Sequence, residues 1–139
     1  MIEIIAGEKG KGKTKELLAK VNHSVAAASG NIVYLDKSQK HMYELNNKVR
    51  LICVPDYGVD NADQFLGFVS GILSQDHDLQ QMYFDSFLDI AHLRDADITP
   101  ALKKLDTLSQ QFKIDFVLSV SMDEADLPES AKSLIAISL

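Results

Sequence analysis

One stretch near the beginning of the chain, Gly7 to Thr14, constrains the fold more than any other. It reads Gly-Glu-Lys-Gly-Lys-Gly-Lys-Thr, the pattern G-x-x-x-x-G-K-[ST] of a phosphate-binding loop. Glycines suit such a loop because, with no Cβ in the way, successive backbone N–H groups can turn toward one anion. In this pattern Lys13 reaches the β- and γ-phosphates and the Thr14 hydroxyl ligates Mg²⁺. The predicted nucleotide-binding residues are Gly7, Glu8, Lys9, Gly10, Lys11, Gly12, Lys13, Thr14 and Lys15.

The sequence on either side of the loop has the character that the motif requires. Residues 1–6 form a short apolar run rich in isoleucine, which predicts a buried parallel strand. After the loop, Leu17, Leu18, Val21 and Val25 recur at helical spacing, and Gly30 is predicted to end the helix. Strand, loop and helix therefore follow one another in the expected order, and the helix N-terminus adds a positive dipole end to the phosphate site.

Length and charge suggest a single domain that carries one basic site. The chain has 139 residues, and we expect residues 1–139 to form one nucleotide-binding domain. Its net charge of −6 argues against a broad nucleic-acid-binding surface. Five lysines nevertheless cluster at the loop and its helix, which suits a polyphosphate ligand: Lys9, Lys11, Lys13, Lys15 and Lys20. With no secretory leader pattern and no membrane-spanning run, we expect a cytoplasmic protein without membrane contact.

The remainder of the chain alternates between apolar runs and helical patterns. Further strands are expected at 31–36, 49–54, 82–85, 115–121 and 134–137. Helices are expected at 37–46, 61–75, 86–93 and 124–132, with another that has Thr99 as N-cap and Pro100 as its first residue. Asp60 or Asn61 is expected to cap the helix 61–75. This alternation predicts a three-layer α/β/α sandwich with a mostly parallel sheet.

Three carboxylates follow predicted strands, and each is a candidate to hold Mg²⁺. Parallel sheets bind ligands beyond the carboxyl ends of their strands, where Asp36, Asp56 and Asp85 would meet the loop. Asp85 is the first choice because Ser86 and a helix follow its strand. Asp36 is the second, and Asp56, which follows Pro55 in a predicted turn, is the third.

Beyond the loop, four short stretches resemble the ATPase core of the RecA-like superfamily. They are Tyr34-Leu35-Asp36-Lys37-Ser38, Leu51-Ile52-Cys53-Val54-Pro55-Asp56, Phe84-Asp85-Ser86 and Leu118-Ser119-Val120-Ser121. The resemblance spans nearly the whole chain and implies a P-loop NTPase fold with ATP and Mg²⁺ as ligands. It makes Asp85 the Walker B aspartate, which would hold the metal together with Thr14, often through water.

The chain departs from that family where hydrolysis is promoted. Ser38 stands where the recombinases supply a glutamate that activates water, and Ser86 stands where related ATPases have a glutamate after the Walker B aspartate. A further serine, Ser121, replaces a longer polar sensor residue. We therefore expect an ATP-binding protein with Mg²⁺-dependent, weak or partner-stimulated hydrolysis, and with Lys13, Asp36 and Asp85 as its catalytic residues. The alternative is a non-hydrolysing, nucleotide-dependent regulatory module that acts on a protein partner or as a homo-oligomer.

Other functional classes find less support. A small kinase needs arginines to clamp its substrates, and the chain has only Arg50 and Arg94. Guanine-specific switches carry Asn-Lys-x-Asp, whereas residues 47–50 read Asn-Lys-Val-Arg. Arg94 could act in trans on a neighbouring subunit, but pairing with Asp95 or Asp97 is the simpler expectation. The segment Asp76-His77-Asp78 and the pair His92 and Asp89 lack a spacing specific for metal.

Overall fold

The computed structural model describes residues 1–139 and contains one sheet of six strands, all parallel. The strands are β1 (Ile2–Ala6), β2 (Asn31–Asp36), β3 (Val49–Cys53), β4 (Leu79–Phe84), β5 (Asp115–Val120) and β6 (Ile135–Ser138). Their order in the sheet is β3-β2-β4-β5-β1-β6. The strand that precedes the glycine-rich loop, β1, therefore lies between β5 and β6, and β5 separates it from β4.

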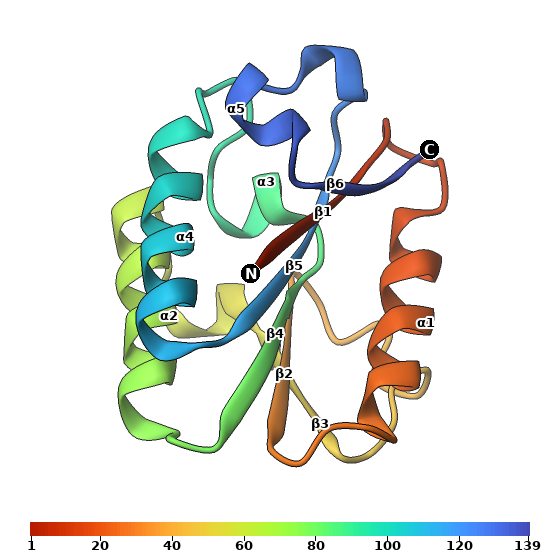
Figure 1. Cartoon of the computed structure of the whole chain (residues 1–139), viewed down its shortest axis with the longest axis vertical. Helices are drawn as coiled ribbons and strands as arrows, with labels where there is room; N and C mark the ends of the chain where they lie inside the picture. Colours follow the sequence, from red (N-terminus) through yellow and green to blue (C-terminus); the bar gives the residue numbers. More distant parts are fainter.

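Helices cover both faces of this sheet, so the expected three-layer α/β arrangement is confirmed. The α-helices are α1 (Lys13–Val25), α2 (Ala62–Gln75), α3 (Phe87–Ile90), α4 (Thr99–Phe112) and α5 (Glu129–Lys132). Two short 3₁₀ helices, η1 (Val54–Tyr57) and η2 (Glu124–Asp126), complete the chain. Helix α1 lies on one face of the sheet, whereas α2 and α4 lie on the other (Figure 1).

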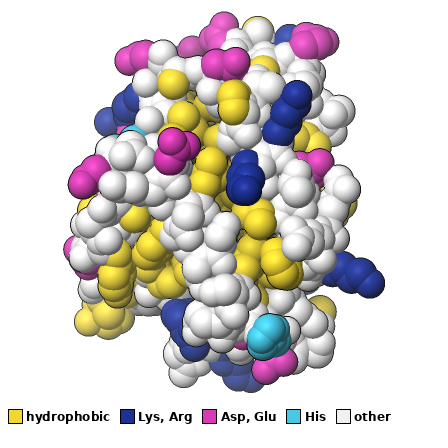
Figure 2. Space-filling view, turned by 90° about the vertical axis from the view of Figure 1, so that its left-hand side faces the viewer, with side chains coloured by type: hydrophobic (Ala, Val, Ile, Leu, Met, Phe, Trp, Pro, Cys, Tyr) yellow, Lys and Arg dark blue, Asp and Glu magenta, His cyan; other side chains and the backbone are white.

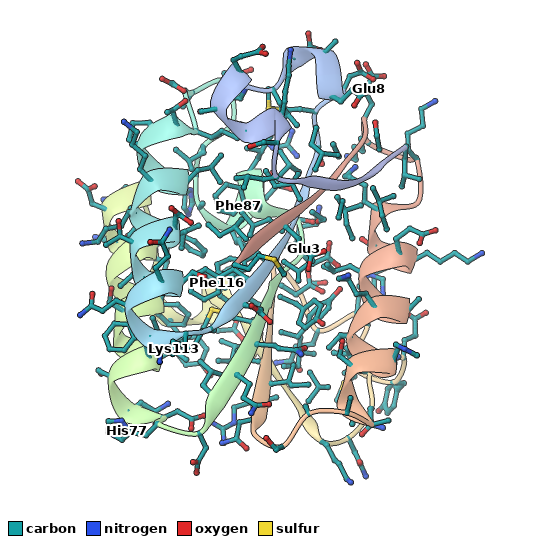
Figure 3. All side chains as sticks on the ribbon, viewed as in Figure 1. Glu3, Glu8, His77, Phe87, Lys113 and Phe116 are labelled. Atoms are coloured by element: carbon teal, nitrogen blue, oxygen red, sulfur yellow. The ribbon has the colours of Figure 1, made fainter.

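Each face of the sheet has its own apolar core. On the α1 side, Leu17 and Val21 pack with Tyr34 and Tyr83, whose rings stack at 6.3 Å between centroids. The larger core, on the α2 and α4 side, contains Phe65, Phe84, Phe87 and Phe116 in edge-to-face contacts. Figure 3 labels Phe87 and Phe116, which lie between the sheet and these helices. Strands buried on both faces explain why apolar runs in the sequence predict them well.

One predicted helix is wrong, and another ends earlier than predicted. Residues 37–46 form a series of turns instead of a helix, and the loop is held by Asn22, whose side chain bonds to the backbone of Glu44 and Asn46 at 2.8 Å each. The helix after the glycine-rich loop forms as predicted but ends at Val25, well before Gly30. Gly30 serves a different purpose, because a Cβ there would lie 2.2 Å from the carbonyl oxygen of Asp78.

Other boundaries shift by a few residues. Asn61 caps α2 as expected, since its side chain accepts a hydrogen bond from the Gln64 N–H. Helix α4 begins at Thr99 itself, with Ile98 as N-cap, so Pro100 is its second residue. Strand β4 begins at Leu79, three residues earlier than predicted, and Asp85 lies just beyond it. The helix expected at 86–93 is confined to 87–90, and the one expected at 124–132 divides into η2 and α5 around Pro128.

This topology places the predicted ligands at one edge of the molecule. Because every strand runs in the same direction, the loop after β1, Asp36 at the end of β2 and Asp85 after β4 share the carboxyl edge of the sheet. No helix in the structure combines the length and the apolar character needed to cross a bilayer.

Candidate functional site

A polar cavity of about 360 Å³ opens at the carboxyl edge of the sheet. None of the sixteen residues that line it is hydrophobic, and five of them carry positive charge. These residues are Lys9, Gly10, Gly12, Lys13, Thr14, Asp36, Lys37, Ser38, Lys40, His41, Asp85, Ser86, Asp89, Arg94, Ser119 and Ser121. Such a lining suits a small, charged, water-soluble ligand.

The glycine-rich loop forms one wall of the cavity. Gly10 and Gly12 have φ angles of 87° and 94°, a left-handed conformation that favours glycine. Lys13 is the first residue of α1 and is buried, with its Nζ donating a hydrogen bond to the Glu8 carbonyl oxygen at 3.1 Å. Burial lowers the pKa of Lys13. Gly7, Glu8, Lys11 and Lys15 belong to the same loop and first turn but do not line the cavity.

Asp85 lies at the base of the cavity and accepts three hydroxyl hydrogen bonds. Thr14 Oγ1 and Ser119 Oγ both donate to Oδ1, at 3.0 and 3.1 Å, and the Tyr34 hydroxyl donates to Oδ2 at 2.7 Å. The carboxylate is 2 % exposed. Because a carboxylate oxygen has two lone pairs, Oδ1 is saturated and Oδ2 retains one free acceptor site. The sequence-predicted pair Thr14 and Asp85 is therefore in direct contact, although 71 residues separate the two.

The backbone after β4 holds Asp85 in this position. The Asp85 N–H donates to the Leu35 carbonyl oxygen at 2.8 Å, which continues the pairing with β2 by one residue. Ser86 then turns the chain with a φ of 54°, and its N–H donates to Ser119 Oγ at 2.9 Å. Ser119 thus bonds to two consecutive residues of this turn and fixes the direction of the aspartate side chain.

Asp36 lines the same cavity, but its carboxylate accepts fewer hydrogen bonds than that of Asp85. It is 2 % exposed, and its Oδ1 accepts the Lys37 N–H at 2.7 Å, whereas its buried Oδ2 has no hydrogen-bond partner. Burial, reinforced by the nearby charge of Asp85, raises the pKa of Asp36 to about 6. An unpaired carboxylate oxygen in a polar cavity is available to a proton, a water molecule or a cation.

Asp89 forms ion pairs with two basic side chains at the rim of the cavity. Its carboxylate pairs with Lys37 Nζ at 3.3 Å and with Arg94 Nε. These contacts, the one to Arg94 above all, lower the pKa of Asp89. The expectation that Arg94 pairs with Asp95 or Asp97 is therefore wrong: the arginine reaches back to α3 and lines the candidate site.

Several residues of the site were not predicted from the sequence. Tyr34 lies two residues before Asp36, and Ser119 lies two residues before Ser121, which both line the cavity. Because side chains alternate along a strand, residues two apart lie on the same face. That periodicity was the available signal. His41 and Asp89 gave none, because they enter the cavity through a loop and a four-residue helix whose paths depend on tertiary contacts.

Other candidates from the sequence lie elsewhere. Asp56 is exposed in η1 and does not line the cavity. The segment Asp76-His77-Asp78 lies at the opposite end of the molecule from Glu8 and the glycine-rich loop (Figure 3). His92 donates from Nε2 to the Val59 carbonyl oxygen at 2.8 Å, which satisfies it structurally.

A second hollow lies between α2 and the start of α4. Its lining includes Leu66, Leu93 and Pro100, and Figure 2 shows hydrophobic side chains gathered along this face. Its titratable residues, Asp63, Asp97 and Lys104, are all exposed, whereas the polar cavity contains buried Lys13, Asp36 and Asp85. The carboxyl edge of the sheet therefore remains the candidate site.

Comparison with known proteins supplies no family for this chain. Neither protein-family models nor curated proteins match it. Its function is accordingly inferred from the geometry of the site.

Proposed function

We propose that this protein binds ATP together with Mg²⁺ at the polar cavity and hydrolyses it slowly, or rapidly only when a partner completes the site. The observation that carries this proposal is the contact between Thr14 Oγ1 and Asp85 Oδ1 at 3.0 Å, beside the glycine-rich loop. Phosphate-loop nucleotidases hold their metal with this combination of a loop hydroxyl and a strand-end aspartate. The resemblance to RecA-like ATPases supports the same roles.

The residues present suit Mg²⁺. This ion prefers oxygen ligands, keeps several of its waters and is held by one or two carboxylates in addition to substrate phosphates. Thr14 and Asp85 would hold it, and the saturation of Asp85 Oδ1 favours contact through water. When bound, the ion neutralises charge that develops on the phosphate oxygens.

Residues of the chain itself would bind the phosphates and orient the attacking water. The loop amides and Lys13 bind the phosphates, and the nearby cations Lys9, Lys37, Lys40 and Arg94 add positive potential to the cavity. Asp36 is the carboxylate that can orient an attacking water, because its Oδ2 is unpaired and its pKa of about 6 suits a weak base. Ser38 and Ser86 line the cavity but cannot act as bases, which is the physical reason to expect slow turnover.

A non-hydrolysing nucleotide switch is the second candidate. It is favoured by Ser86, whose N–H is already bonded to Ser119 and whose side chain offers no carboxylate beside Asp85. A kinase is less well supported, since Arg94 is paired with Asp89 and Arg50 does not line the cavity. Transfer of phosphate from ATP to a panel of nucleosides, nucleotides and sugars would overturn that ranking.

Replacement of Lys13 tests nucleotide binding directly. We expect Lys13→Ala to weaken binding of a fluorescent ATP analogue by about 10–100-fold, since the variant loses a charge-assisted contact to phosphate. Lys20→Ala is the matched control, because this lysine lies on the same helix and pairs with Glu3 at 3.3 Å, outside the cavity. Equal affinity of the Lys13 variant and the wild type would refute the proposal.

Phosphate release measured in the same titration separates the two candidate functions. Binding with slow release supports a weak or partner-dependent ATPase, and binding without release supports the switch. Competition between ATP and GTP tests the base preference, and a marked preference for GTP would contradict the assignment to ATP.

A further inference from the structure

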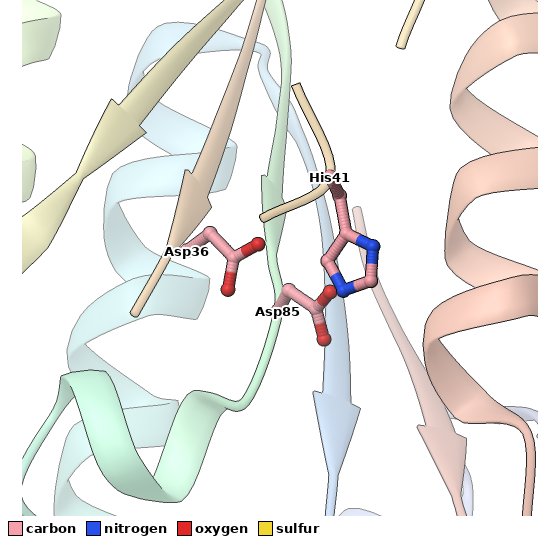
Figure 4. A group of neighbouring side chains, drawn as sticks. All are labelled: Asp36, His41 and Asp85. Carbon is pink, nitrogen blue, oxygen red and sulfur yellow. The ribbon is translucent and has the colours of Figure 1, made fainter. Parts of the chain in front are cut away.

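A histidine and two aspartates meet inside the polar cavity in an arrangement that the nucleotide site does not require. Asp36, His41 and Asp85 each offer one ligand atom, and these atoms lie within 4.8 Å of one another. Figure 4 shows one ring nitrogen of His41 turned toward the carboxylate of Asp85, and the carboxylate of Asp36 lies on the side of Asp85 away from the ring. The three residues come from the end of β2, the following loop and the turn after β4.

The ring of His41 is held as metal-binding histidines are held. Its Nδ1 lies 2.7 Å from Glu44 Oε2, and because an ionised carboxylate only accepts, Nδ1 carries the proton. In the neutral ring, Nε2 is then the acceptor that can ligate a metal. A carboxylate behind the opposite ring nitrogen is the usual outer partner of a histidine that ligates metal, since it fixes the tautomer and raises the basicity of the ligating nitrogen.

A second observation points independently to a missing ligand. Asp36 is 2 % exposed, its Oδ2 has no hydrogen-bond partner, and the residue lines the cavity. Buried polar atoms in folded proteins are nearly always paired, so this oxygen needs an explanation. A cation between Asp36 and Asp85 would supply one and would also relieve the repulsion between two buried carboxylates.

We propose that Asp36, His41 and Asp85 form a binding site for a divalent cation of the Zn²⁺ and Co²⁺ class in the nucleotide-free protein. One imidazole nitrogen and two carboxylate oxygens suit such ions, whereas Mg²⁺ prefers oxygen ligands alone. Ligand atoms around one such ion at 2.0–2.2 Å lie about 3–4.4 Å apart, which is close to the 4.8 Å within which the three ligand atoms lie here. The remaining coordination positions face the cavity and would hold water.

This site does not depend on the proposed nucleotide function, although Asp36 and Asp85 belong to both. An ion in the cluster would use the free lone pair of Asp85 Oδ2, since Oδ1 is saturated by Thr14 and Ser119. The ion would also withdraw Asp36 from any role as a base. The protein would then hold a metal before nucleotide enters.

Cobalt titration of the chelator-treated, nucleotide-free protein tests the proposal. We expect one equivalent of Co²⁺ to bind with the visible absorption bands of a nitrogen- and oxygen-ligated ion, and Zn²⁺ to displace it. His41→Gln should lower the affinity at least tenfold, and Glu44→Gln should lower it by about tenfold through the lost orientation of the ring. The absence of stoichiometric binding, or an unchanged affinity in His41→Gln, would overturn the site.

Two controls make the outcome specific. His77→Gln removes an exposed histidine flanked by Asp76 and Asp78 at the far end of the molecule, and it should leave the titration unchanged; an equal loss there would show surface binding and refute the site. Lys13→Ala should retain cobalt binding while it loses nucleotide, so failure of this site and failure of the nucleotide proposal are distinguishable. Asp36→Asn should also lower the affinity for cobalt, because it replaces a charged ligand by a neutral amide, and circular dichroism checks that the variant keeps its fold.

Discussion

Asp36 is the residue whose environment is least favourable in its charged form. Its Oδ2 is buried without a partner and a second carboxylate lies nearby, and together these raise its pKa from 3.8 to about 6. Asp85, equally buried, accepts three hydroxyl hydrogen bonds that stabilise its negative charge. The two aspartates at neighbouring strand ends therefore differ in their surroundings. Asp85 is fixed as a hydrogen-bonded carboxylate that suits a metal, whereas Asp36 has a free oxygen that suits the exchange of a proton or an ion.

The raised pKa of Asp36 predicts a dependence of stability on pH. A carboxyl group whose pKa is higher in the folded chain than in the unfolded chain costs stability as it ionises, so its contribution to the free energy of unfolding falls between about pH 4 and pH 6. Asp36→Asn removes this cost. In urea denaturation with chelator present, the variant should be more stable than the wild type by about 1–3 kcal/mol at pH 7–8 and equal to it near pH 4.

The control for this measurement is Asp56→Asn, which changes an exposed carboxylate after the neighbouring strand β3. It should leave the pH profile of stability as it is in the wild type. A profile that Asp36→Asn does not flatten would contradict the assignment of a raised pKa to this residue.

At the scale of elements, the strands and the position of the glycine-rich loop before a helix could be predicted from the sequence, and the path of the loop after β2 could not. Strands buried on both faces leave a continuous apolar run, and the glycine-rich loop has a strict local pattern. Met42 and Leu45, by contrast, have helical spacing, but Asn22 on α1 binds the backbone on either side of Leu45 and holds the segment in turns. The ring of His41, and with it the proposed metal site, depends on this long-range contact and was therefore invisible in the sequence.

The close approach of two loops at the amino edge of the sheet gives a prediction at this scale. Gly30 precedes β2, and a Cβ there would lie 2.2 Å from the Asp78 carbonyl oxygen, which also accepts the Asn31 N–H at 2.8 Å. Gly30→Ala should therefore destabilise the protein by about 2 kcal/mol or more, because the backbone pairing at the start of β2 and β4 has to move. Thermal or urea unfolding measures the loss.

A second glycine provides the comparison. Gly71 lies in the middle of α2, and a Cβ there would have no heavy atom within 4 Å. Gly71→Ala should stabilise the protein by roughly 0.5–1 kcal/mol, the gain expected when a helical glycine becomes alanine. Equal effects of the two substitutions would show that the contact at Gly30 is unimportant.

At the scale of the whole molecule, one continuous sheet is shared by both apolar cores, so the chain should unfold in a single transition. A ligand at the carboxyl edge then stabilises every element together. At a concentration a hundred times its Kd, Mg²⁺–ATP should add about 2.7 kcal/mol to the free energy of unfolding and raise Tm by roughly 5–10 °C. Differential scanning calorimetry checks both points. With Mg²⁺ alone the shift should be absent, and in Lys13→Ala, whose affinity falls 10–100-fold, it should drop to about 0.4–1.4 kcal/mol at the same nucleotide concentration. A second transition that nucleotide leaves unmoved would contradict the shared core.

The place of β1 in the sheet has a consequence for the order of assembly during synthesis. This strand lies between β5 and β6, so residues 2–6 pair only with residues 116–120 and 135–138. A ribosome must therefore make most of the chain before the first strand has any neighbour, and contacts of such long sequence separation form slowly. Until then the glycine-rich loop is attached to an unpaired apolar segment. The glycine-rich loop is synthesised first, but the polar cavity that it lines can form only after β1 has joined the sheet.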